Sequence, residues 1–369
     1  MEELRRDMAA SDFDQSRLFK LIYEEEYGTM GGIPFSSFVA DLYFDKSDAD
    51  ILLLRFLSSI ASASHAPLLV GVKPSMFELR SFMDLHLPRD LKKIFENSDA
   101  ISWNSFRDTD ESRYVSLFLP YVLMRLPYGP ANPVRSFNYV ESVDGERNDT
   151  FCWGNPAYFM GIKINEAIVK HGWAAAIRGP EGGGLVRDLP AYTFKTSFGD
   201  ISMKCPTQTH ITDRREKELS DLGFISLCHK KMTNEAVFFS GQTVQRAKRY
   251  TSTDIDASAN LSSKMPYMLN ASRFAHYIKV IMRDKVGSFQ SAKNIESYLQ
   301  GWIAQYVLLL DEAEQNVKAE YPLREAQIKV EESQVPGEYN VTLNMRPHFQ
   351  MEGLRICLRF VAKILAEVE

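Results

Sequence analysis

Two stretches of alternating apolar and polar residues near the C-terminus constrain the fold of this chain most strongly. The apolar positions are Tyr339, Val341, Leu343 and Met345 in the first stretch, and Leu354, Ile356, Leu358 and Phe360 in the second. Because successive side chains of a strand point to opposite faces, each stretch predicts a half-buried strand. Pro347 has no N–H to donate, so we expect the first strand to end there.

The second predicted strand lies close to the end of the chain. In an isolated subunit, such a strand forms a sheet edge with unpaired N–H and C=O groups. The edge is either an ordinary edge or a place where another subunit adds a strand. The alternation alone leaves both possibilities open.

The N-terminal half of the chain predicts a different kind of sheet. Residues 33–44 are rich in aromatic and β-branched side chains, residues 49–65 carry an apolar helical face, and residues 68–72 form a short apolar run. This β-α-β order is typical of a parallel or mixed sheet covered by helices. We therefore expect an α/β fold with a mixed sheet.

Further elements follow from spacing and turn residues. We predict a helix over residues 151–170 that ends at Gly172, a strand over 173–177, a hairpin over 192–204 and a polar linker over 251–260. Residues 260–285 and 291–310 have the apolar spacing of two long amphipathic helices. The expected organisation is an N-terminal helical segment (1–30), an α/β middle domain (31–255) and a C-terminal domain (256–369) with two long helices and antiparallel strands.

Composition narrows the classes of partner. The chain has 369 residues, more than one ordinary domain, with 43 Lys and Arg against 48 Asp and Glu. This balance argues against nucleic acid as the main partner and against a polybasic membrane anchor. The N-terminus lacks an apolar signal core and no run is long enough to cross a membrane, so we expect a cytoplasmic protein without membrane insertion.

The residues give no support for an enzyme, a metal site or a cofactor. The four cysteines are far apart, and the seven histidines show no metal-ligand spacing. His276 lies in an apolar run and is interpreted as a hydrogen-bonded core residue. No serine lies in a G-x-S-x-G motif, so we name no catalytic, cofactor-binding or metal-binding residue.

A run of glycines follows the strand predicted over residues 173–177. Gly182, Gly183 and Gly184 lack the order of a phosphate-binding loop, and the carboxylate of Glu181 would repel phosphate. We interpret the run as a close-packed structural turn that includes at least one residue with positive φ. Nucleotide is not expected to bind there.

A dense mixed-charge turn occupies the start of a predicted helix. Arg214, Arg215 and Glu216 have helical spacing. They form solvated pairs, cap the central sheet, or make ion pairs with a neighbouring subunit.

The chain resembles the large subunit of the contractile sheath of type VI secretion systems. The matching pieces are EEEYG (24–28), PRDL (88–91), SFR (105–107), SRY (112–114), RLPYG (125–129), WGN (153–155), AIRG (176–179), EGGGL (181–185), DRREKELSDLGF (213–224), SRFAHY (272–277), PLREA (322–326) and RPHFQ (346–350). Each piece is short, but together they run in order from about residue 20 to about residue 361.

The resemblance implies a structural role in the bacterial cytoplasm and a tail-sheath-like C-terminal domain. The implied partners are a small sheath subunit in a heterodimer, neighbouring sheath subunits, an inner tube protein and, through the assembled sheath, the baseplate and an AAA+ unfoldase. It also implies that the C-terminal strands pair with strands of adjacent chains. The alternatives are another homo-oligomeric scaffold and an α/β enzyme of unknown reaction.

The sequence departs from the family pattern at both ends. Family members carry a further segment upstream of the position of Met1, with one of the exchanged strands. The tail continues through residues 364–369, where relatives usually stop near a Leu-Pro.

Overall fold

A six-stranded mixed sheet forms the centre of the computed structural model. The model describes residues 2–348, apart from 11, 12, 287, 289, 290, 311, 333 and 335–338, together with residue 350. The strand order is β1 (Phe38–Phe44), β2 (Leu68–Val72), β3 (Val115–Leu119), β9 (Phe224–His229), β10 (Ala236–Phe238) and β6 (Leu185–Val186). The first four are parallel and the last two are antiparallel to their neighbours. The predicted mixed α/β fold is confirmed.

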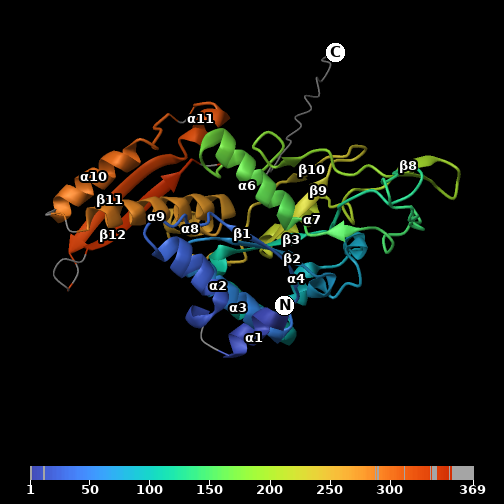
Figure 1. Cartoon of the computed structure of the whole chain (residues 1–369), viewed down its shortest axis with the longest axis horizontal. Helices are drawn as coiled ribbons and strands as arrows, with labels where there is room; N and C mark the ends of the chain where they lie inside the picture. The colour runs from blue at the N-terminus through green and yellow to red at the C-terminus, as the bar shows by residue number, and fades with distance from the viewer. Residues whose placement is uncertain are drawn as a thin grey trace, which may run out of the picture.

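The central strands are apolar at nearly every position because helices cover both faces of the sheet. In β2, Leu68 and Val70 point into one core while Leu69 points into the other, as the two-residue period of a strand requires. One face is covered by α3 (Asp48–Ala63), α4 (Leu91–Ile94), α5 (Ile101–Arg107) and α7 (Asp213–Asp221). Helix α6 (Ala157–His171) lies on the opposite face (Figure 1).

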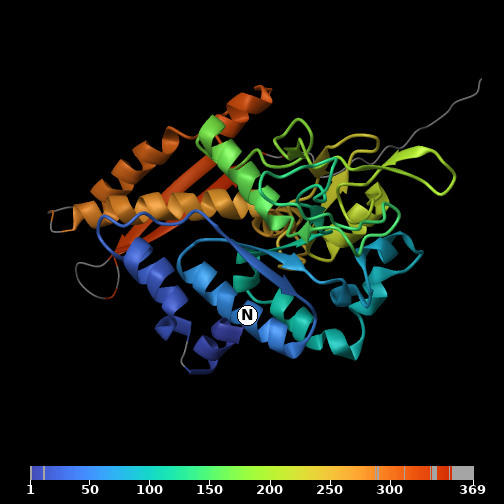
Figure 2. The same ribbon diagram turned by 45° about the vertical axis from the view of Figure 1, so that its right-hand side comes forward.

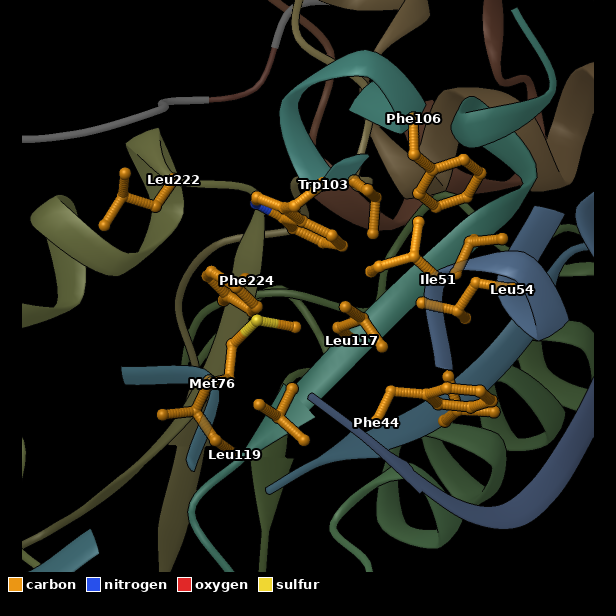
Figure 3. Packing of buried hydrophobic residues seen from close by; sticks show 14 of the residues in the cluster. Phe44, Ile51, Leu54, Met76, Trp103, Phe106, Leu117, Leu119, Leu222 and Phe224 are labelled. Carbon is orange, nitrogen blue, oxygen red and sulfur yellow. The ribbon is translucent and has the colours of Figure 1, made fainter. Parts of the chain in front are cut away.

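Aromatic side chains fill the first of these cores. The rings of Trp103 and Phe224 stack with centroids 5.6 Å apart and planes 13° apart. Figure 3 shows Met76 and Leu117 close to this pair, with Ile51 of α3 reaching the same core. The core therefore joins α3, α5 and the strands into one packed unit.

The described elements between residues 265 and 347 form a second layer. Helices α9 (Met265–Lys285) and α10 (Ala292–Ala304) run alongside a ribbon of β11 (Leu323–Glu332) and β12 (Tyr339–Pro347) (Figures 1 and 2). Helix α11 (Gln315–Glu320) precedes the ribbon. The two long helices and antiparallel strands in the C-terminal part were predicted and are confirmed. Of the two alternating stretches, the first forms β12, and the second lies outside the described residues. Strand β12 ends at Pro347, as its missing donor required.

Short elements complete the described chain. They are α1 (Glu2–Ala10), α2 (Arg17–Phe19), a π-helix (Lys20–Gly28), β4 (Val122–Leu123), β5 (Trp153–Gly154), β7 (Thr193–Lys195), β8 (Ile201–Met203), α8 (Thr253–Ser262) and 3-10 helices at Phe13–Gln15, Pro74–Phe77, Phe82–His86, Ser98–Ala100 and Glu111–Tyr114. Strands β7 and β8 form the predicted hairpin. Gly172 ends α6 with φ of +80°, as expected of a C-terminal cap.

The secondary structure predicted for two segments was wrong. Residues 173–177 do not form a strand, because Trp173 stacks on Phe274 at 4.2 Å between centroids and the Ala174 N–H donates to Asn270 Oδ1 at 3.2 Å. Side chains of α9 thus take the place of a neighbouring strand. The linker predicted over residues 251–260 is instead largely helix α8, in which Asn260 Nδ2 donates to the Asp256 carbonyl at 2.9 Å. The Asn260 side chain bonds one turn back within the helix, so its polarity does not exclude helix formation.

The N-terminal segment is fastened to α9. Arg283 donates to the carbonyls of Thr29 at 2.7 Å and Tyr27 at 3.0 Å, and Lys279 Nζ lies 3.3 Å from the centroid of the Tyr27 ring. Beneath this contact, His276 is 2% exposed and its Nε2–H donates to the Ser64 carbonyl at 2.9 Å. The interpretation of His276 as a hydrogen-bonded core residue is confirmed.

His276 predicts an acid dependence of stability. Burial lowers its pKa from 6.5 to about 4, and the surrounding Arg273, His65 and Lys279 add to this effect. The unfolded chain therefore binds the proton more tightly, so the stabilisation is complete above pH 6.5 and is lost as the pH falls toward 4. We expect this group to account for a loss of about 3 kcal/mol over that range.

The measurement is urea unfolding of the wild type and His276→Gln at several pH values. The glutamine can donate to the Ser64 carbonyl but does not titrate. Its unfolding free energy should therefore fall less steeply than that of the wild type below pH 6.5. Parallel curves for the two proteins would contradict the assignment.

Candidate assembly interface

The β11–β12 ribbon has one buried face and one exposed face. Ile328 pairs with Leu343 and Val330 with Val341, and these side chains pack into a core with α9 and α10. The opposite face carries polar pairs such as Lys329 with Thr342, and both side chains are exposed. Since the buried face fixes which residues point inward, the register of the ribbon is well specified.

The outer edge of β11 is already occupied by side chains of α10. Gln300 Nε2 donates to the Ala326 carbonyl at 3.0 Å, and Gln300 Oε1 accepts the Ile328 N–H at 2.9 Å. Glu296 Oε2 accepts the Val330 N–H at 2.9 Å. The N–H groups of Ile328 and Val330 are therefore not available to another strand.

The main chain closes the beginning of the same edge. The Leu308 N–H donates to the Leu323 carbonyl at 2.8 Å, and the Leu323 N–H donates to the Tyr306 carbonyl at 3.2 Å. These bonds make a parallel bridge between Val307 and Leu323. The edge of β11 is therefore occupied at Leu323, Ala326, Ile328 and Val330.

The outer edge of β12 is different. In an antiparallel pair, partners that do not bond to each other direct their N–H and C=O groups to opposite sides. Because Ile328 and Val330 direct theirs toward α10, their partners Leu343 and Val341 direct theirs away from the ribbon. Within the described part of the chain, no backbone group pairs with this edge at Val341 or Leu343.

The structure places three of the predicted interface residues in this ribbon. Tyr339, Val341 and Leu343 lie in β12, with half-buried side chains on its inner face. Leu354, Ile356, Leu358 and Phe360, the other predicted interface residues, lie outside the described residues. Their role stays a prediction.

The chain beyond β12 is anchored to the middle of the protein. Gln350 Oε1 accepts two hydrogen bonds from the Arg178 guanidinium, at 2.7 and 3.2 Å, and Gln350 Nε2 donates to the Ala175 carbonyl at 2.9 Å. Arg178 is only 8% exposed. A buried guanidinium thus holds the start of the tail beside the glycine run.

The glycine run shapes the backbone that carries Arg178. Gly183 has φ of +90°, in the left-handed region expected for at least one residue of the run. A Cβ atom would lie 2.2 Å from the Ala176 oxygen at Gly183, 2.3 Å from the Arg178 oxygen at Gly182, and 2.6 Å from the Phe238 oxygen at Gly184. Each neighbour is a backbone atom that has little room to move, so the turn requires glycine at all three positions.

The three residues of the predicted mixed-charge turn lie at the start of helix α7, and their environments differ. Arg215 donates to Glu218 at 2.6 Å and to the carbonyls of Leu87 and Arg89 at 2.9 and 3.0 Å. Glu216 is half-buried beside β9, and burial raises the pKa of its carboxyl. Arg214 is exposed and has no hydrogen-bond or ion-pair partner among the described residues.

These environments predict losses of stability of different size for the two arginines. Arg215→Ala removes hydrogen bonds that tie α7 to residues 87–89, and should lower the unfolding free energy by about 2 kcal/mol. The matched change Arg214→Ala should alter it by less than about 0.5 kcal/mol. Urea unfolding of both variants measures the difference, and equal losses would contradict it.

Sequence reasoning missed the residues that close the β11 edge and anchor the tail. Glu296 and Gln300 lie four residues apart beside the apolar stripe of Ile295 and Leu299, so their helical position was readable but their strand partner was not. Arg178 and Gln350 were each part of a matched motif. Nothing in the sequence indicated that these two motifs meet.

The described residues offer little for catalysis. They contain no group of three or more His, Cys, Asp or Glu side chains that could hold a metal ion. A cleft of about 510 Å³ lies between α6, the glycine run and α11, and its walls carry Lys163 and Lys170 together with Glu166 and Glu181. No described helix is both long enough and apolar enough to cross a membrane.

Comparison with known proteins covers nearly the whole chain. Residues 1–245 match the EvpB/VC_A0108 tail sheath N-terminal domain, and residues 254–364 match the EvpB/VC_A0108 tail sheath gpW/gp25-like domain. The type VI secretion system sheath protein TssC1 of Pseudomonas aeruginosa strain PAO1 is 43% identical over 358 residues. That alignment covers 95% of this chain and 71% of TssC1.

Solved structures show a more distant similarity. A chain of the anti-feeding prophage baseplate has a TM-score of 0.46 and 11% identity, with 85% of this chain and 66% of that chain covered. A chain of the contracted helical sheath of the same particle has a TM-score of 0.37 and 12% identity, with 88% and 68% covered.

Proposed function

We propose that this chain, which belongs to the EvpB/VC_A0108 family of tail sheath proteins, is the large subunit of a contractile sheath that assembles by strand exchange between subunits. Membership of this family makes the chain a structural sheath subunit of a type VI secretion system and not an enzyme. The finer proposal adds a small sheath subunit as the partner in a heterodimer, and an inner tube protein that the sheath surrounds.

The one-sided ribbon is the observation that carries this proposal. β11 is closed by α10 and by residues 306–308, whereas β12 directs the N–H and C=O groups of Val341 and Leu343 outward. Of the two edges of this ribbon, the described residues thus leave β12 for a strand from a neighbouring chain. Main-chain hydrogen bonds of this kind keep subunits joined while they rotate during contraction.

The inner face of the ribbon sets the pattern of the incoming strand. Its apolar side chains have to continue the layer of Val341 and Leu343 over α9 and α10, while its polar side chains lie beside Thr342. A strand with alternating apolar and polar residues meets this requirement. A uniformly polar segment does not.

The second alternating stretch belongs to the same proposal. We place Leu354, Ile356, Leu358 and Phe360 in a strand that also pairs between subunits. Gln350, which is held by Arg178, fixes the point from which this stretch departs. Contacts of the assembled sheath with a baseplate and with an AAA+ unfoldase, and a cytoplasmic location, complete the proposed role.

Electron microscopy of the chain co-expressed with a candidate small sheath subunit tests the proposal. Tubes or stable heterodimers are the expected result. Tubes formed by this chain alone would indicate a homo-oligomeric scaffold, and a chain that stays monomeric beside its partner would contradict the proposed role.

A further inference from the structure

We infer that Gln300 and Glu296 act as an edge guard, which prevents β11 from pairing with a second copy of this chain. The inference rests on the proposed function, because a closed β11 edge matters for assembly when β12 receives the incoming strand. It adds to that function the residues that decide which edge is used.

The contacts of Gln300 reproduce those of a strand residue. In a parallel pair, one residue donates its N–H to the carbonyl before its partner and accepts the N–H after it. The Gln300 amide does the same around Gln327, since it donates to the Ala326 carbonyl at 3.0 Å and accepts the Ile328 N–H at 2.9 Å. The side-chain amide therefore replaces one residue of a neighbouring strand.

Glu296 extends this substitution by one step along β11. Its carboxylate accepts the Val330 N–H at 2.9 Å, one helical turn from Gln300 and two residues along the strand from Ile328. The buried side chains of Ile295, Leu299 and Ile303 hold this face of α10 against the ribbon. The guard is thus fixed by packing and does not depend on long flexible side chains alone.

An unguarded β11 would compete with productive assembly. Open edges with buried apolar neighbours pair readily with another edge. Two copies that joined through β11 would form an isologous pair, which is closed and cannot grow. A single open edge at β12 instead favours head-to-tail contacts, which generate a helical array.

The test compares the isolated chain with the double variant Gln300→Ala and Glu296→Ala. The matched control is Lys293→Ala with Ser297→Ala, two exposed positions of the same helix. Hydrogen exchange of the Ile328 and Val330 amides should accelerate by about tenfold or more in the guard variant. At equal protein concentration, sedimentation should show a larger fraction of dimers for the guard variant than for the wild type or the control variant, and the amides of the control variant should exchange as in the wild type.

Hydrogen exchange of the Lys329 amide, which lies in the β11–β12 ladder, distinguishes opening of the β11 edge from unfolding of the whole ribbon. The inference predicts that this amide keeps its slow exchange, because Lys329 bonds to β12 and not to α10. Unchanged exchange at Ile328 and Val330, or equal acceleration at Lys329, would overturn the inference. Absence of tubes from the wild type would defeat the proposed function instead, and would leave this result on the isolated chain intact.

Discussion

Gly183→Val should lower the unfolding free energy by about 3 kcal/mol or more, because it combines backbone strain with a collision. The valine would have to adopt φ near +90°, and its Cβ would lie 2.2 Å from the Ala176 oxygen. The collision is with backbone that leads directly to Arg178, so relief would disturb the anchor of the tail. Urea unfolding measures the loss.

Gly172 provides the matched control for strain without collision. It has φ of +80°, and a Cβ atom there would meet nothing within 4 Å. Gly172→Val should therefore cost only about 1–2 kcal/mol, the penalty of a left-handed backbone for a residue with a side chain. Equal losses at the two positions would show that the crowding around Gly183 does not contribute.

Val341→Pro should abolish tube formation while the isolated chain stays folded. Proline removes the N–H that Val341 directs away from the ribbon, and its ring obstructs an incoming strand. The ladder with β11 loses no hydrogen bond, because the bonding partner there is the neighbouring Thr342. Negative-stain microscopy with the small sheath subunit, together with thermal unfolding of the isolated chain, measures both effects.

Two further variants separate the causes. Val341→Ala removes the side chain but keeps the N–H, so tubes should still form. Thr342→Pro removes a donor to β11 and should destabilise the isolated chain instead. Tubes from Val341→Pro at the yield of Val341→Ala would contradict pairing at the β12 edge. We propose that proline at Ile356 or Leu358, in the second predicted strand, also blocks assembly, because it removes a backbone donor and obstructs docking.

The sequence predicted the parts of the fold in which one period dominates. Residues 68–72 are apolar throughout because β2 is covered on both faces, and the alternation around Val341 reflects a ribbon with one buried face. Residues 173–177 were misassigned because an apolar run of that length suits a strand as well as it suits a segment held by Asn270 and Phe274.

The candidate interface could be predicted only in part. Alternation identified β12, but which edge of the ribbon is open depends on Gln300 and Glu296, whose contacts with β11 are tertiary. The anchor of the tail joins Arg178 to Gln350 across 172 positions of sequence. Spacing within a motif carries no information about pairings of this kind.

Hydrogen exchange in assembled sheaths tests the central claim most directly. The amides of Val341 and Leu343 should exchange rapidly in the isolated chain and become protected in tubes formed with the small sheath subunit. The amides of Ile328 and Val330, already bonded to α10, should change little. Rapid exchange at Val341 and Leu343 in intact tubes would contradict strand addition at β12.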